Sequence, residues 1–280
     1  MGKLDGKVAL ITGGARGQGR SHALAMAAEG ADIVVADIAA DMPVLGYPLA
    51  TLDQLAETVK LVEDLDRRAL GLQVDARDTA QVQAAVDRTM EEFGRIDILL
   101  ANHGIVDFST VENTTDEAWN TIVDTNLTGI FKAIRAVLPH MRQAGYGRIV
   151  ATSSMGARNT SPNLAHYIAA KWGVIGLVKS CALEVADFGI TVNAICPGAV
   201  NTDLFFNQPT YNIFCPDIEN PTAEDFERRM RDTSKGLNGR AYLEPEHVSR
   251  AVMYLVTDDD GVITGQVMEI GLGGPALGIG

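Results

Sequence analysis

The sequence predicts a doubly wound α/β fold, in which helices cover both faces of one seven-stranded parallel sheet. Seven short runs rich in Val, Ile and Leu recur along the chain, and stretches with helical periodicity separate them. The runs are apolar at consecutive positions, which is typical of parallel strands buried on both faces. The alternation of strand and helix gives the fold class. The predicted strands are 8–11, 33–36, 69–74, 96–101, 149–152, 192–195 and 267–270.

Length and composition predict a single domain and exclude several classes of partner. No linker or repeat divides the 280 residues, of which 46% are hydrophobic and 21% charged. The net charge of −13 repels a phosphate backbone, so we expect no nucleic-acid partner. No apolar stretch is long enough for a membrane span. The three cysteines lack metal-ligand spacing and fit a reducing cytoplasm, so we expect a cytoplasmic protein without a metal.

Helix signals lie in the gaps between the predicted strands. Helical patterns cover 20–29, 53–67 and 165–183, and Pro245 predicts the start of a helix near the C-terminus. A Thr114-x-x-Glu117 capping box predicts the start of another near Thr115. Two segments show no such pattern: about 39–55, which reads as a loop inserted after the second strand, and about 201–240, which reads as a mobile lid.

A glycine-rich loop follows the first predicted strand and precedes the first predicted helix. Glycines let a backbone approach a pyrophosphate closely, and the N-terminus of the next helix stabilises its negative charge. This strand, loop and helix therefore predict a dinucleotide site and a Rossmann-type sheet. The residues expected to form the cradle are Gly13, Arg16, Gly17, Gln18 and Gly19.

The choice of nucleotide depends on Asp37, which ends the second predicted strand. It stands about 20 residues after Gly17, the usual interval to a carboxylate that binds the adenosine ribose. A carboxylate there favours NAD and repels the 2′-phosphate of NADP. Arg16 favours NADP instead, because a basic residue in the glycine loop can bind the 2′-phosphate. Asp75 and Ala76, after the third strand, are expected to bind the adenine.

The candidate catalytic residues are Ser154, Tyr167 and Lys171. Tyr167 and Lys171 are four residues apart in a helical stretch and share one face. Ser154 follows the fifth strand, at the sheet edge where ligands bind in open α/β sheets. An ammonium beside a phenol favours the phenolate, so Tyr167 can accept an alcohol proton while Ser154 holds the oxygen. The site predicts interconversion of an alcohol and a ketone.

In its motifs the chain resembles the short-chain dehydrogenase/reductase family over nearly its whole length. The TGxxxGxG loop, Asn126, Ser154, the Tyr-x-x-x-Lys pair and the dipeptide Pro197-Gly198 occur in the family's order. The resemblance implies that Asn126 supports a water-mediated proton relay from Lys171. It also implies a homotetramer. For the cofactor it implies binding by Tyr167 and Lys171, by Asn102 and Gly104 after the fourth strand, and by Pro197, Val200 and Thr202.

Two departures from the family pattern stand out. Ala101-Asn102-His103-Gly104 replaces the usual Asn-Asn-Ala-Gly, and His103 is either a space-filling substitution or a substrate-binding residue. The insertion 39–55 is similar to that of the carveol-dehydrogenase-like, mycofactocin-coupled subgroup of actinobacteria. That similarity implies a terpene-alcohol-like substrate and mycofactocin as external electron acceptor. Aromatic residues of the lid suggest an apolar substrate or simple lid packing: Phe205, Phe206, Tyr211 and Phe214.

Two other functions remain open from the sequence. One is a non-catalytic sensor or scaffold that binds a dinucleotide, although the Ser, Tyr and Lys expected of an enzyme are all present. The other is an NADP-dependent carbonyl reductase, in which Arg16 would prevail over Asp37.

Overall fold

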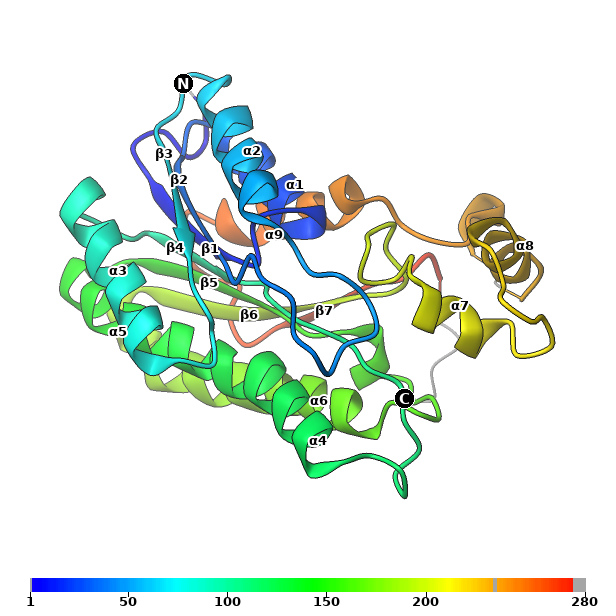
Figure 1. Ribbon diagram of the computed structural model, residues 1–280. Coiled ribbons are helices and arrows are strands. Elements are labelled where there is room, and N and C mark those ends of the chain that lie inside the picture. The colour runs from blue at the N-terminus through cyan, green and yellow to red at the C-terminus, as the bar shows by residue number, and fades with distance from the viewer. Residues whose placement is uncertain (1, 234–235, 274–280) are drawn as a thin grey trace.

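The computed structural model describes residues 2–233 and 236–273, and these form the predicted doubly wound α/β fold (Figure 1). All strands of the central sheet run parallel, in the order β3-β2-β1-β4-β5-β6-β7. The order reverses between β1 and β4, which opens a crevice at the carboxyl ends of these strands. The strands are β1 Val8–Thr12, β2 Asp32–Asp37, β3 Ala69–Gln73, β4 Ile98–Ala101, β5 Gly147–Thr152, β6 Ile190–Pro197 and β7 Val267–Ile270.

Helices cover the two faces of the sheet as two separate apolar layers. Alternate residues of β1 divide between them: Leu10 packs in the layer of α3, α5 and α6, and Ile11 in the layer of α1, α2 and α9. This alternation follows from the period-2 geometry of a strand. The helices are α1 Gly17–Ala28, α2 Leu52–Glu63, α3 Thr79–Phe93, α4 Asp116–Val123, α5 Ile130–Ala144, α6 Ala165–Glu184, α7 Gln208–Phe214, α8 Ala223–Thr233 and α9 Pro245–Val256.

One predicted helix end and one predicted capping residue are wrong, while the predicted helix start near Thr115 is confirmed. The helix predicted over 53–67 ends at Glu63, and Asp66 has a φ of +57°, which continues a turn and not a helix. The capping box at Thr114 does not form. The N-cap is Thr115, whose hydroxyl accepts a hydrogen bond from the backbone N–H of Ala118, while the Thr114 hydroxyl bonds back into the preceding turn.

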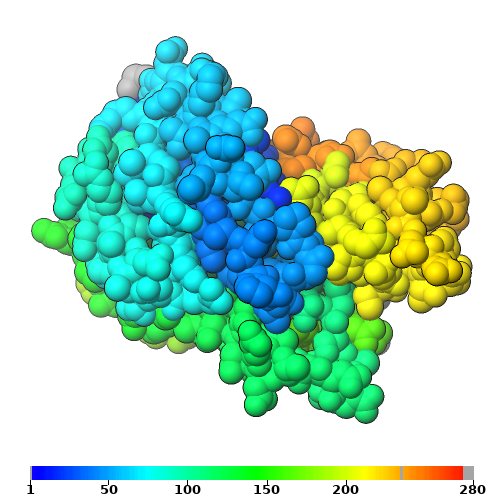
Figure 2. Space-filling view, in the orientation of Figure 1, coloured from blue at the N-terminus to red at the C-terminus, as the bar shows by residue number. Residues whose placement is uncertain are grey.

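The insertion after β2 lies across the carboxyl edge of the sheet as an irregular loop. Its apolar side chains form a small core of their own with the segment that follows β4. In the space-filling view the insertion, in blue, meets the lid segment, in yellow (Figure 2). The loop ends at Thr51, which with Gln54 forms the capping box of α2. It thus covers the crevice where β1 and β4 diverge.

The lid segment, residues 201–240, is more ordered than its composition suggests. It carries α7, α8 and a short 3-10 turn, Leu237–Gly239, with a cluster of aromatic side chains between them. Figure 1 shows α7 and α8 projecting beside the carboxyl ends of the strands. Residues 234 and 235 of the predicted lid, and residues 274–280 of the C-terminal tail, lie outside the described residues. The mobility expected of the lid stays a prediction.

Candidate active site

The glycine-rich loop has the geometry that a phosphate cradle requires. Gly13 and Gly17 have φ values of +68° and +55°, which side chains disfavour. A Cβ at Gly19 would lie 2.0 Å from the carbonyl oxygen of Gly13, so no larger residue fits where α1 meets the loop. The N-cap of α1 has no side-chain hydrogen bond, which leaves the N-terminal N–H groups of the helix for a ligand.

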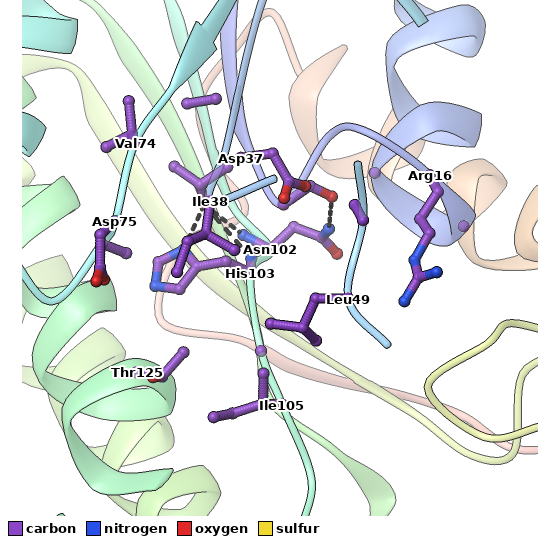
Figure 3. A pocket seen from close by; sticks show the side chains of 18 of the residues that line it. Arg16, Asp37, Ile38, Leu49, Val74, Asp75, Asn102, His103, Ile105 and Thr125 are labelled. Carbon is purple, nitrogen blue, oxygen red and sulfur yellow. Dashed lines mark hydrogen bonds between the residues drawn. The ribbon is translucent and has the colours of Figure 1, made fainter. Parts of the chain in front are cut away.

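A pocket lies along this loop and contains the predicted residues for the adenosine half of a dinucleotide (Figure 3). A second pocket adjoins it, and Gln18, Asn102, Gly104 and Thr202 line both. The Gln18 side-chain oxygen is buried without a hydrogen-bond partner, which fits a polar ligand passing from one pocket to the other. Of the predicted cofactor residues, the first pocket holds Gly13, Arg16, Gly17, Gly19, Asp37, Asp75 and Ala76, and the second Pro197, Val200, Tyr167 and Lys171.

Asp37 and Asp75 both line the first pocket but differ in their partners. The Asp37 carboxylate accepts hydrogen bonds from the backbone N–H groups of Ala15 and Ala39, at 3.1 Å each, which fix it at the end of β2. Asp75 is instead held by Arg77, whose guanidinium nitrogens lie 2.7–3.1 Å from its carboxylate oxygens. Burial opposes ionisation of Asp75, but the Arg77 hydrogen bonds leave its pKa below the usual value.

His103 lines the first pocket and not the second, which favours the space-filling role over substrate binding. Its Nδ1 lies 2.6 Å from the Thr12 hydroxyl. Burial, with Lys171 adding to it, lowers the pKa of His103 to about 4, so the imidazole is neutral at pH 7. It fills the space beside Gly129, where a Cβ would lie 2.7 Å from Nε2.

The three candidate catalytic side chains meet in the second pocket. The Ser154 hydroxyl accepts a hydrogen bond from the Gly156 N–H at 3.0 Å. Burial raises the pKa of Tyr167, and a hydrogen bond to Ser154 partly offsets that effect. Lys171 is buried 5.7 Å from the Tyr167 ring centroid and donates to the Thr152 carbonyl at 2.9 Å. Burial lowers the pKa of Lys171 to about 8, and the ammonium form prevails at neutral pH.

Asn126 lies in a π-helical turn, Asp124–Gly129, between α4 and α5. Its fully buried amide spans the backbone of Ile105: Nδ2 donates to the carbonyl and Oδ1 accepts from the N–H, both at 2.8 Å. The side chain is therefore committed to holding the segment that follows β4. A Cβ at Gly104 would lie 3.1 Å from Asn126 Oδ1 and 3.2 Å from Lys171 Nζ, so this segment passes directly between the two.

Sequence reasoning missed two residues close to the site. Tyr47 of the insertion lines the first pocket and is 7% exposed. Its hydroxyl accepts a hydrogen bond from the Val106 N–H at 3.0 Å. His166, directly before Tyr167, is fully buried with Nε2 3.6 Å from Asp107, and that contact lowers the Asp107 pKa. The available signals were that Tyr47 is the one aromatic residue of the insertion, and that His166 is adjacent to Tyr167.

Phe226 of α8 is the centre of the aromatic cluster in the lid. It is fully buried, and four aromatic ring centroids lie 5.0–5.5 Å from its own: Phe205, Phe206, Tyr211 and Phe214. Two of these four, Phe205 and Phe214, also line the second pocket. The lid aromatics therefore pack together, and two of them also form a pocket wall; the apolar substrate stays a prediction.

Phe226→Ala is expected to raise KM for an apolar alcohol while changing kcat little. Truncating a buried Phe typically costs about 3–5 kcal/mol of packing, and here the loss falls on the wall formed by Phe205 and Phe214. Steady-state kinetics with a secondary alcohol test this, with Phe226→Leu as a milder control. An unchanged KM in a folded Phe226→Ala protein would show that the cluster does not shape the pocket.

Comparison with known proteins fits this geometry. The family model described as short chain dehydrogenase matches residues 7–210. The chain belongs to this short chain dehydrogenase family. Its predicted fold and oxidoreductase class are therefore confirmed. Within the described residues no group of three His, Cys, Asp or Glu side chains is placed to hold a metal ion, and no helix is long and apolar enough to cross a bilayer.

Several relatives of this short chain dehydrogenase match along nearly its entire length. A (-)-trans-carveol dehydrogenase of Rhodococcus erythropolis is 42% identical, with 98% of this chain and 99% of that protein covered. A 3-alpha-(or 20-beta)-hydroxysteroid dehydrogenase of Mycobacterium bovis is 36% identical, with coverages of 99% and 92%. The crystal structure of carveol dehydrogenase from Mycobacterium avium in complex with NAD superposes with a TM-score of 0.93, at 42% identity and coverages of 97% and 98%.

Proposed function

We propose that this protein is an NAD-dependent dehydrogenase that interconverts an apolar, terpene-like secondary alcohol and its ketone. The observation that carries this is the convergence of Ser154, Tyr167 and Lys171 in an apolar pocket that adjoins the dinucleotide pocket. The carveol dehydrogenase from Mycobacterium avium, which is similar over 97% of this chain, was crystallised in complex with NAD. Asp37 at the end of β2 favours the same nucleotide, because its carboxylate lines the pocket where a ribose would bind.

The three catalytic candidates of the second pocket, and Asn126 beside it, each have a role in this reaction. Bound NAD supplies the hydride acceptor. Tyr167 takes the alcohol proton, Ser154 holds the substrate oxygen, and the Lys171 ammonium favours the phenolate of Tyr167. Asn126 acts by position, because its amide fixes the Ile105 backbone beside Lys171. A relay of the proton from Lys171 through water completes the proposal.

The lining of the second pocket supports an apolar, uncharged substrate. Among the described residues that line it, Lys171 alone carries a charge, and apolar side chains dominate the rest. The remote walls come from the loop after β4, the segment before α6 and the lid: Val106, Phe108, Leu164, Leu204, Phe205, Phe214 and Met230. A charged alcohol would lose its hydration there without gaining a partner.

A panel of secondary alcohols tests this function. Purified protein is assayed with carveol, a cyclic aliphatic alcohol, a hydroxysteroid and a charged 2-hydroxy acid, with NAD, with NADP and with an artificial electron acceptor. We expect turnover of the neutral cyclic alcohols with NAD and no turnover of the acid. Tight NAD binding without oxidation of any alcohol would favour a dinucleotide sensor, and faster ketone reduction with NADPH a carbonyl reductase.

The pH dependence should follow the raised pKa of Tyr167. Because the phenol is protonated at neutral pH and alcohol oxidation needs the phenolate, kcat/KM for oxidation should rise roughly tenfold per pH unit between about pH 6 and 8. Ketone reduction, which needs the phenol, should stay level there. Lys171→Arg keeps its charge at all these pH values and serves as the control. A flat oxidation profile, with hydride transfer rate-limiting, would argue against Tyr167 as the base.

We further propose a homotetramer in the cytoplasm with mycofactocin as the external acceptor. Large apolar side chains exposed on α4, α5 and α6 support assembly: Trp119, Phe131 and Trp172 are 41–48% exposed. Three buried free thiols, Cys181, Cys196 and Cys215, fit a reducing compartment. The insertion that covers the cofactor pocket supports an external acceptor, because a trapped NADH must be reoxidised in place. Sedimentation tests the tetramer. An assay that supplies oxidised mycofactocin and follows its reduction by the bound NADH tests the external acceptor.

A further inference from the structure

The Arg16 side chain does not point toward the ribose end of the cofactor pocket, as the side chain of a residue that binds a 2′-phosphate would. Its guanidinium donates through Nη2 to the carbonyl of Pro48, at 2.7 Å, and through Nη1 pairs with Asp203, at 2.8 Å. Pro48 belongs to the insertion and Asp203 to the lid. Figure 3 shows the Arg16 side chain and the Asp37 carboxylate entering the pocket from different sides.

The two partners of Arg16 are held in place by their own segments. Asn207 donates from Nδ2 to the backbone carbonyl of Asp203 at 2.9 Å, and Thr202 packs so closely on the glycine loop that a Cβ at Gly17 would lie 3.1 Å from its methyl group. In the insertion, the Leu49 N–H donates to Asp41 at 2.7 Å, directly after Pro48. A Cβ at Gly46 would lie 2.9 Å from Pro209, so insertion and lid also touch each other.

These contacts set the charge that a nucleotide phosphate would meet. Among the described residues that line the pocket, Arg16 is the one permanent cation, while Asp37, Asp75 and Asp203 are carboxylates. Arg77 pairs with Asp75, and Asp203 pairs with Arg16. A guanidinium whose outer nitrogens are bonded to a carboxylate and a carbonyl cannot offer its fork to a phosphate at the same time.

We propose that Asp203 of the lid is a specificity-determining residue that excludes NADP by holding Arg16. Asp37 then acts by repelling the 2′-phosphate, and Asp203 by withholding the cation that would otherwise attract it. Loss of Asp37 alone leaves the phosphate without a partner, and loss of Asp203 alone leaves Asp37 in place. The exchange of cofactor therefore requires both changes. This inference rests on the proposed use of NAD.

The test is a double-mutant cycle of Asp37→Ser and Asp203→Asn. After charcoal treatment to remove bound nucleotide, NADH and NADPH are each titrated by their fluorescence. In the Asp37→Ser background, Asp203→Asn should tighten NADPH binding about tenfold and leave NADH binding nearly unchanged. In the wild-type background it should change neither appreciably. Adding Arg16→Gln to the double variant should remove the gain, and Asp203→Glu should behave as wild type.

Two outcomes would overturn the proposal. If the double variant binds NADPH no better than Asp37→Ser, Asp203 does not withhold Arg16. If Asp203→Asn weakens NADH and NADPH equally in both backgrounds, the residue merely latches the lid. The NAD(H) to NADP(H) ratio that co-purifies from cells, which contain both nucleotides, gives a second readout if charcoal fails to strip the protein. NADH binding without alcohol oxidation would contradict the proposed function and leave this inference standing.

Discussion

Tyr167→Phe is expected to lower kcat for alcohol oxidation by about a hundredfold or more, the usual contribution of a positioned acid or base. The phenyl ring keeps the contacts of Tyr167 with the core of the insertion, so the pocket retains its shape. Only the hydroxyl that bonds Ser154 is lost. NAD binding should stay nearly intact, which separates this change from general damage.

The measurement compares single-turnover rates and bound NAD content for wild type and variant. Ser154→Ala provides a matched control, because it removes the other hydroxyl of the same hydrogen bond and should lower the rate without abolishing proton transfer. If Tyr167→Phe retains more than about a tenth of the wild-type kcat, another residue is the base.

Shortening the insertion is expected to speed NAD release at least about tenfold, because a cover over a bound ligand acts mainly on the dissociation rate. Four apolar side chains of the loop, each at most 9% exposed, pack over the pocket region: Met42, Leu45, Tyr47 and Leu49. In wild type we therefore expect NAD(H) that survives desalting, with weak steady-state activity on added NAD. Replacing residues 40–50 by a Gly-Ser linker keeps Thr51 as the N-cap of α2.

A second variant keeps this test decisive if the shortened chain fails to fold. Leu45→Ser with Leu49→Ser preserves the loop length and weakens only its packing, while Tyr47→Phe removes only the hydrogen bond to Val106. The rate at which excess NADH exchanges for bound NAD is followed by nicotinamide fluorescence. Exchange as fast in wild type as in all three variants would mean that the insertion is not a cover.

Local signals explain why much of the fold was predictable. The central strands are apolar on both faces, so the ends predicted from the sequence lie within two residues of the observed ends, and the predicted 267–270 strand matches β7. The glycine loop is equally local, because its dihedral angles and its close approach to α1 are encoded at Gly13, Gly17 and Gly19. The errors fall where adjacent residues compete for one role, as Thr114 and Thr115 do for the cap of α4.

The contacts that could not be predicted join segments far apart in the sequence. Arg16 was expected to be available to a nucleotide phosphate, but its partners stand 32 and 187 positions away in two irregular segments without periodicity. Asp75 lines the cofactor pocket as expected, and its binding of the adenine stays a prediction, but its pairing with Arg77 two residues later was not predicted. Side-chain pairing in loops depends on how the loops pack, which no local pattern records.

The fit between His103 and Gly129 has a consequence for how this site varies among relatives. The imidazole occupies the volume that a side chain at 129 would need, and a Cβ there would also lie 3.1 Å from the Ala76 methyl group. The two positions thus share one fixed volume, since a packed interior has no room to spare. We expect that a relative with Ala in place of His103 gains room for a side chain at 129 and that a relative with His does not. We therefore expect the residues at positions 103 and 129, which are 26 residues apart, to covary in size among relatives.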